Sequence, residues 1–110
     1  FDNYSTGRRS FVRFGPEEEG DIRDRERLDY LFKKYNFSGI VHLAGLIMVE
    51  DSTKRPLDYY ESNVQGSLTL LQAAAHAGVK SFVFASTASV YGVPQSLPLY
   101  EDHPLNPCSP

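Results

Sequence analysis

The residues from Ser81 to Gly92 constrain the fold of this chain more than any other stretch. Within them, Phe82 to Ala85 form an apolar run without alternation, which is typical of a strand buried on both faces of a parallel sheet. The run ends in the hydroxyl side chains of Ser86, Thr87 and Ser89. Because ligands bind at the carboxyl ends of strands in an open α/β sheet, these hydroxyls are candidates for contact with a polar substrate. The alternative is that they cap a helix or form a turn, and this stretch alone leaves both interpretations open.

Two helices and a second strand are predicted before this stretch. One helix runs from its cap Asp24 to about Tyr35. A longer helix runs from Pro56 to Gly78, because proline suits the first turn of a helix and glycine often ends one. Ile40 to Ala44, between them, is predicted as a buried strand. The residues expected to face the core are Leu28, Leu31, Phe32 and Tyr35 in the first helix, and Leu57, Tyr60, Val64, Leu68, Leu71 and Ala75 in the second.

Near the N-terminus, Phe1 to Asn3 is predicted as the end of a strand, and Ser10 to Phe14 alternates enough for a short strand. An order of strand, helix, strand, helix, strand has connections long enough for parallel crossovers. We therefore expect an α/β fold with a partial Rossmann-type doubly wound parallel sheet. Because the chain opens at Phe1 in a strand and closes at Pro110 in a proline-rich loop, we expect it to be a segment of a longer protein.

Composition narrows the classes of partner. The net charge of −3 argues against non-specific binding of nucleic acid, which needs a cationic face. The single cysteine, Cys108, cannot form an internal disulfide, no metal-ligand spacing is present, and a reducing cytoplasm fits both features. No apolar run approaches the length of a membrane span. We expect a cytoplasmic protein with no metal, nucleic-acid or membrane partner.

Four residues, Asp2, Asp21, Gly45 and Thr87, follow successive predicted strands and are expected to share one edge of the sheet. Asp2 suits the ribose hydroxyls of an adenine dinucleotide, although it also suits the start of a turn. Asp21 suits an adenine amino group, although it also favours the N-terminus of the next helix electrostatically. Gly45 permits close approach of the backbone to a flat ligand.

Two polar residues lie inside predicted regular elements. His42 sits in an apolar strand and is interpreted as a hydrogen-bonded core residue rather than a catalyst. Asn63 is a poor helix former on a stripe with Tyr59 and Gly66, beside the predicted core stripe. Such an inward-facing amide needs a partner, and the backbone of a neighbouring loop would serve.

Five ordered motifs bring a family into view. They are Phe-Asp-Asn-Tyr-Ser-Thr-Gly, Gly-Asp-Ile-Arg-Asp, Val-His-Leu-Ala-Gly-Leu, Pro-Leu-Asp-Tyr-Tyr-Glu-Ser-Asn-Val-Gln-Gly and Ala-Ser-Thr-Ala-Ser-Val-Tyr-Gly. Together they resemble the extended short-chain dehydrogenase/reductases, in particular the NAD-dependent epimerase/dehydratase family, over essentially all 110 residues. The resemblance implies an isomerase that binds NAD and interconverts UDP-glucose and UDP-galactose through a transient 4-keto sugar. It also implies a homodimer, and makes residues 1–110 the middle part of an NAD-binding Rossmann domain, without the substrate domain.

The resemblance also assigns roles to residues. Thr87 would be the catalytic hydroxyl that hydrogen-bonds the 4-oxygen of the sugar, while a Tyr assisted by a Lys four residues later would act as the base. Asp2 and Asn3 would hold the adenosine ribose, and Asp21 and Ile22 would bracket the adenine. The other implied cofactor-binding residues are Ser5, Thr6, Gly7, Leu43, Ala44, Gly45, Leu46, Asn63 and Ser86.

The chain departs from the family pattern in two ways. Ile47 stands where these epimerases usually carry Lys, which removes a positive charge from beside the cofactor. No glycine-rich turn precedes Asp2, and no Tyr-x-x-x-Lys pair follows Thr87, since Tyr91 has Gln95 four residues on. We therefore expect the 110 residues alone to be inactive. A 4,6-dehydratase, a uronate epimerase and a non-catalytic NAD-binding relative remain alternatives.

Overall fold

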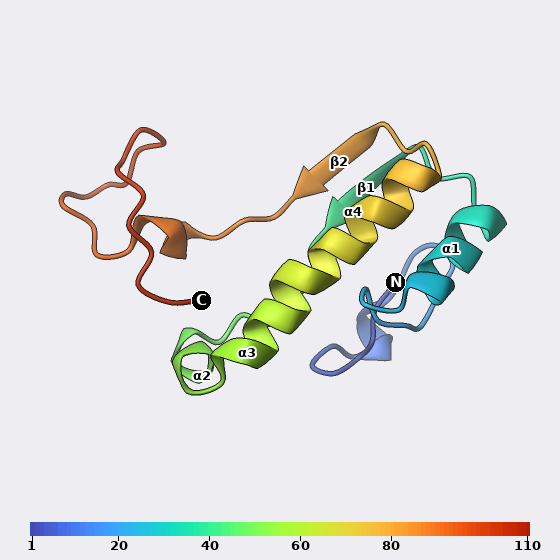
Figure 1. The fold of residues 1–110 in the computed structure, drawn as a ribbon, viewed down its shortest axis with the longest axis horizontal. Coiled ribbons are helices and arrows are strands. Elements are labelled where there is room, and N and C mark those ends of the chain that lie inside the picture. Colours follow the sequence, from blue (N-terminus) through green and yellow to red (C-terminus); the bar gives the residue numbers. More distant parts are fainter.

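The computed structural model describes the whole chain, Phe1 to Pro110, with helices beside a small parallel sheet (Figure 1). The elements are η1 (Arg9–Phe11), α1 (Arg25–Lys34), β1 (Gly39–His42), α2 (Val49–Lys54), α3 (Pro56–Tyr59), η2 (Tyr60–Gln65), α4 (Gly66–His76), β2 (Ser81–Phe84) and η3 (Ala88–Tyr91). Among the η segments, η2 is a π-helix and the other two are 3-10 helices. No helix combines the length and the apolar character needed to cross a bilayer.

The sheet has the predicted parallel arrangement. All four residues of β1 pair with those of β2, and the chain between the two strands runs through α2, α3, η2 and α4. A separate parallel bridge joins Asp2 to Glu19 near the N-terminus. Parallel strands joined by a helical crossover confirm the expected α/β, Rossmann-type class.

The strand predicted over Ser10 to Phe14 is wrong. Arg9–Phe11 form η1 instead, and both Phe11 and Phe14 are exposed. Alternation makes a strand only where a neighbouring strand accepts its hydrogen bonds, and this segment pairs with none.

Helix α1 forms as predicted from its cap. The Asp24 carboxylate accepts a hydrogen bond from the backbone N–H of Arg27 at 2.9 Å, which satisfies a free donor of the first turn. Leu28 and Leu31 are both buried, so the predicted core face of this helix is confirmed. A core cluster joins α1 to α4 and to one face of the sheet. Its buried members are Ile22, Leu28, Leu70 and Ala73, and the partly buried Phe32, Ile40 and Phe82 pack against them.

The predicted long helix consists of α3, η2 and α4, which follow one another without a break from Pro56 to His76. The core face predicted for this long helix is wrong. The stripe containing Leu57, Val64 and Leu68 is exposed along its length, as are Tyr60, Leu71 and Ala75. The face toward the core carries Tyr59, Gly66, Thr69, Leu70, Ala73 and Ala74. A Cβ at Gly66 would lie 2.7 Å from Ile22 Cδ1, so the smallest residue is required where the helix approaches the core.

The expectation that β2 is buried on both faces is also wrong. Phe82 packs against the core, but Val83 is 58% exposed, as is its pairing neighbour Val41 at 64%. The core cluster lies on only one face of the sheet, and successive side chains of a strand point to opposite faces. Beyond β2 the chain leads away from the sheet into η3 and the C-terminal loops (Figure 1).

Candidate functional site

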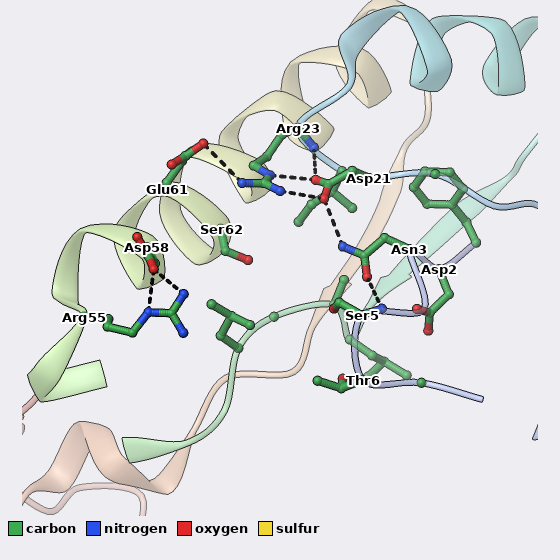
Figure 2. Close-up of a pocket in the computed structure, with 18 residues that line it drawn as sticks. Asp2, Asn3, Ser5, Thr6, Asp21, Arg23, Arg55, Asp58, Glu61 and Ser62 are labelled. Carbon is green, nitrogen blue, oxygen red and sulfur yellow. Dashed lines mark hydrogen bonds and ion pairs between the residues drawn. The ribbon is translucent and has the colours of Figure 1, made fainter. Parts of the chain in front are cut away.

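A cavity of about 410 Å³ lies where the loops after several strand ends meet (Figure 2). Most of the residues that the motifs assign to cofactor binding line it, and they come from three separate segments of the chain. They are Asp2, Asn3, Ser5, Thr6, Gly7, Asp21, Ile22, Leu43, Ala44, Gly45 and Leu46. The predicted convergence of Asp2, Asp21 and Gly45 is therefore present in the structure.

The first segment is shaped by two consecutive side-chain turns. Asp2 Oδ1 accepts a hydrogen bond from the backbone N–H of Tyr4 at 2.7 Å, and Asn3 Oδ1 accepts one from Ser5 at 3.0 Å. These bonds hold Tyr4 at φ +55°, which is uncommon outside glycine. A Cβ on Gly7 would lie 3.2 Å from Asp2 Oδ2, so glycine lets the loop fold close to this carboxylate. No hydrogen bond within the chain occupies Asp2 Oδ2, which leaves it able to accept one from a ligand.

The Asp21 carboxylate is the most heavily hydrogen-bonded group of the site. Its Oδ1 accepts from the Arg23 backbone N–H at 2.9 Å and from Arg23 Nε at 2.8 Å. Its Oδ2 accepts from Arg23 Nη2 at 2.8 Å and from Asn3 Nδ2 at 2.9 Å (Figure 2). These bonds, chiefly those of the Arg23 side chain, hold the pKa of Asp21 well below its ordinary value of 3.8.

The two interpretations of Asp21 can now be weighed on geometry. A carboxylate has about four acceptor positions, and the chain itself fills four. An adenine amino group would therefore have to replace one of these donors, and the adenine contact stays a prediction. In the structure, Asp21 connects the turn at Asn3 to Arg23 through hydrogen bonds to both residues.

Several lining residues were not predicted from the sequence. In addition to its bonds with Asp21, Arg23 donates from Nη1 to Glu61 Oε1 at 3.1 Å (Figure 2). Arg55 Nε donates to Asp58 Oδ2 at 2.8 Å. The two guanidinium groups thus lie on the rim, each already paired with carboxylates. Ser62, Phe1 and Gly20 complete the cavity lining. Arg23 lies within a recognised motif, but its partner Glu61 is 38 residues away, so only the fold reveals the contact.

The loop from Leu43 to Leu46 is braced from behind by Asn63. The Leu46 N–H donates to Asn63 Oδ1 at 2.8 Å, and Asn63 Nδ2 donates to the Leu46 carbonyl at 2.9 Å. Asn63 is not among the cavity-lining residues, so its place is as a support for the loop. The loop backbone as partner of this amide, predicted from the sequence, is confirmed.

His42 is the hydrogen-bonded core residue that the sequence predicted. It is 3% exposed, its Nε2 lies 2.7 Å from Ser67 Oγ, and burial lowers its pKa.

Ser86 and Thr87 do not line this cavity. They follow β2, whose end is tied to β1 by a hydrogen bond from the Ala85 N–H to the His42 carbonyl at 3.1 Å. Thr87 Oγ1 accepts from the Ser89 N–H at 3.1 Å and caps η3, so the capping interpretation is realised. That bond uses the oxygen as acceptor and leaves the hydroxyl proton available, so the catalytic role of Thr87 and the cofactor contact of Ser86 stay predictions.

A parallel sheet with helices on one face, and polar loops gathered at the strand ends, defines a Rossmann-type α/β unit. A family model described as GDP-mannose 4,6 dehydratase matches residues 15–110, and the chain belongs to this family.

Named relatives are more specific. The UDP-glucose 4-epimerase of Rhizobium leguminosarum bv. trifolii is 56% identical over 110 residues, which cover 97% of this chain and 34% of that protein. The Homo sapiens UDP-glucose 4-epimerase is 50% identical over 92 residues, 84% of this chain and 26% of that protein. The resemblance to this group of epimerases is thus confirmed.

Solved structures agree with the sequence relatives. The UDP-glucose 4-epimerase of Brucella ovis in complex with NAD superposes with a TM-score of 0.93 at 39% identity, covering 98% of this chain and 33% of that one. The Bifidobacterium longum enzyme in complex with NAD+ and UDP gives 0.78 at 36% identity, covering 81% of this chain and 27% of that one. The chain spans about a third of the length of the first curated relatives that it matches.

Proposed function

We propose that the protein carrying these residues is an NAD-dependent UDP-glucose 4-epimerase that acts through a transient 4-keto sugar. The observation that carries this proposal is the cavity, because three segments far apart in the sequence bring eleven of the predicted cofactor-binding residues together around it. The relatives named above support the same activity.

The side chains present fit an adenine dinucleotide. Ribose hydroxyls are donors, and the carboxylate of Asp2 keeps one oxygen without a partner in the chain. Ala44 lines the cavity with a small side chain, which suits a flat ligand, and Ile22 supplies an apolar contact. A Cβ on Gly45 would lie 3.1 Å from Asn63 Oδ1, so glycine at this position lets Asn63 brace the loop. Bound NAD would supply the reversible hydride acceptor that the epimerisation needs.

Thr87 is proposed to orient the sugar. Its oxygen already accepts from the Ser89 N–H, so its proton is free to be donated to the 4-oxygen of the sugar. A hydrogen bond fixed in advance at this position stabilises the charge that develops there as the 4-hydroxyl loses its proton.

Residues 1–110 are proposed to be the middle part of the NAD-binding domain. An apolar groove of about 570 Å³ separates the Asp2–Glu19 bridge from β1, and Phe1, Ile40 and Val41 are among its lining residues. Within this chain, β1 pairs only with β2, so the edge of β1 away from β2 is open. A further strand of the same parallel sheet would satisfy this edge and fill the groove.

A homodimer is proposed from the exposed stripe of the long helix. Leu57, Tyr60, Val64, Leu68 and Leu71 lie along one exposed side, with exposed fractions from 44% to 79%. A row of apolar side chains of this kind is typical of a helix that packs against a partner. The cytoplasmic location expected from the single cysteine is likewise a proposal.

The test is an assay of the purified full-length protein with UDP-galactose, in which UDP-glucose dehydrogenase reports the UDP-glucose formed. We expect turnover together with NAD that co-purifies with the protein. No formation of UDP-glucose from UDP-galactose by NAD-loaded protein would refute the epimerase, and absence of NAD binding would refute the cofactor site.

A nucleotide-sugar 4,6-dehydratase is the second candidate. The description of the matching family favours it, as does Ile47 at a position where these epimerases usually carry Lys. The same preparation should then release a 4-keto-6-deoxy sugar nucleotide from GDP-mannose, which mass spectrometry detects as the loss of one water molecule.

A further inference from the structure

The loop from Leu43 to Gly45, which lines the cavity, is anchored at both of its ends to one stretch of the long helix. At its start, His42 Nε2 lies 2.7 Å from Ser67 Oγ. At its end, Leu46 exchanges two hydrogen bonds with the Asn63 side chain, at 2.8 and 2.9 Å. The two anchors are themselves joined, because Ser67 Oγ donates to the backbone carbonyl of Asn63.

The direction of the hydrogen bonds follows from the donor inventory. A carbonyl can only accept, so the single proton of the Ser67 hydroxyl goes to Asn63. His42 must therefore donate its Nε2–H to Ser67 Oγ. This histidine is 3% exposed, and burial lowers its pKa, so the neutral ring that donates through Nε2 is the stable form. The result is one chain of bonds from β1 through Ser67 of α4 and Asn63 of η2 to the end of the loop.

The helix is irregular where this chain of bonds crosses it. The π-helix η2 spans Tyr60–Gln65 and includes Asn63, while Ser67 lies in the first turn of α4. Single π-helical turns occur often at functional sites, since they change the direction in which a side chain leaves the helix. Here the change coincides with the residue that braces the loop.

We propose that His42 and Ser67 are positioning residues for the cofactor, which hold the Leu43–Gly45 backbone in shape through Asn63. This inference rests on the proposed function, because it assumes that NAD lies on that backbone. Neither residue needs to touch the cofactor, and both act through the loop.

Thr69 offers a matched control on the same helix. Its Oγ1 donates to the carbonyl of Gln65 at 2.9 Å, which is the same local bond that Ser67 makes to Asn63. Thr69 is buried, but its hydroxyl makes hydrogen bonds only with Gln65 and none with His42 or with the loop. Ser67→Ala and Thr69→Val therefore each remove one hydroxyl that is half-buried or buried, and only the first interrupts the chain of bonds.

The experiment measures two quantities in the full-length protein: hydrogen exchange of the Leu46 amide, and the rate at which bound NAD is released. We expect Ser67→Ala to speed both by roughly three- to tenfold, a factor that corresponds to the net contribution of about one hydrogen bond. Thr69→Val should leave both rates within about twofold of the wild-type values, even if it lowers the melting temperature as much as Ser67→Ala does. Equal effects of the two variants, or none on Leu46 exchange, would overturn the proposal.

His42 is tested by a conservative pair. His42→Gln keeps an N–H donor near Ser67 and should retain most of the protection of Leu46, whereas His42→Phe keeps the ring volume and should lose it. Identical exchange in the two variants would overturn the role of His42. If His42→Phe fails to fold, the comparison of wild type with His42→Gln and Ser67→Ala decides. Leu46 exchange is measured without cofactor, so a failure of NAD binding in the wild type is recognised separately as a failure of the proposed function.

Discussion

The Asp21 carboxylate should contribute about 2 kcal/mol to the free energy of unfolding. In Asp21→Asn, one oxygen can still accept from Arg23, but the new amide group faces Arg23 Nη2 and Asn3 Nδ2, which are both donors. Two hydrogen bonds are lost, at about 0.5–1.5 kcal/mol each. The ion pair adds less than about 1 kcal/mol, because the Arg23 side chain is 43% exposed.

Asp24→Asn is the matched control, since it makes the same change three residues away. Asp24 caps α1 by accepting from the Arg27 N–H, and Asn caps a helix about as well as Asp. We expect this variant to lose less than about 0.5 kcal/mol. Urea unfolding of both variants and of the wild type at pH 7 measures the difference. Equal losses would refute the claim that the four bonds at Asp21 matter more than its charge.

The contribution of the Asp21 carboxylate to stability should also depend on pH. The pKa of Asp21 is lower in the folded protein than its ordinary value of 3.8, so its contribution is fully present above that value. As the pH falls below about 4 toward the folded-state pKa, the contribution is lost. The stability gap between wild type and Asp21→Asn should therefore be constant from about pH 8 to pH 5 and then narrow. A gap that widens in acid would refute the assignment.

Three further outcomes are expected from the site and the surface of the full-length protein. Thr87→Val should lower the turnover number roughly 100-fold while leaving retention of NAD unchanged, whereas equal loss of both would mark Thr87 as structural. Ile47→Lys places a cation beside the cavity and should tighten NAD binding a few-fold in calorimetry at low salt; a gain that persists at about 1 M salt would not be electrostatic. Leu68→Glu should shift sedimentation from dimer to monomer, while Leu97→Glu, at another exposed leucine, should not; no shift would place the dimer interface elsewhere.

The sequence predicted the elements that depend on local chemistry. Asp24 as a cap and the apolar spacing of Leu28 and Leu31 sufficed for α1, and the run after Ser81 sufficed for β2. The cavity was predicted because its residues lie in short motifs at strand ends. Its rim was not, because the Arg23–Glu61 contact joins segments that only the fold brings together.

The long helix shows why periodicity alone does not identify the buried face. Its larger apolar residues, such as Leu57 and Leu68, recur at the correct spacing but are exposed, while Gly66 and Ala73 face the core. Close approach to Ile22 and the sheet favours small side chains, so the buried stripe is less hydrophobic per residue than the exposed one. Two apolar stripes on one helix indicate two packing partners. The stripe of small residues, which includes Gly66 and Ala73, packs against the core. The stripe of larger residues, which includes Leu57 and Leu68, would be buried by the proposed dimer contact.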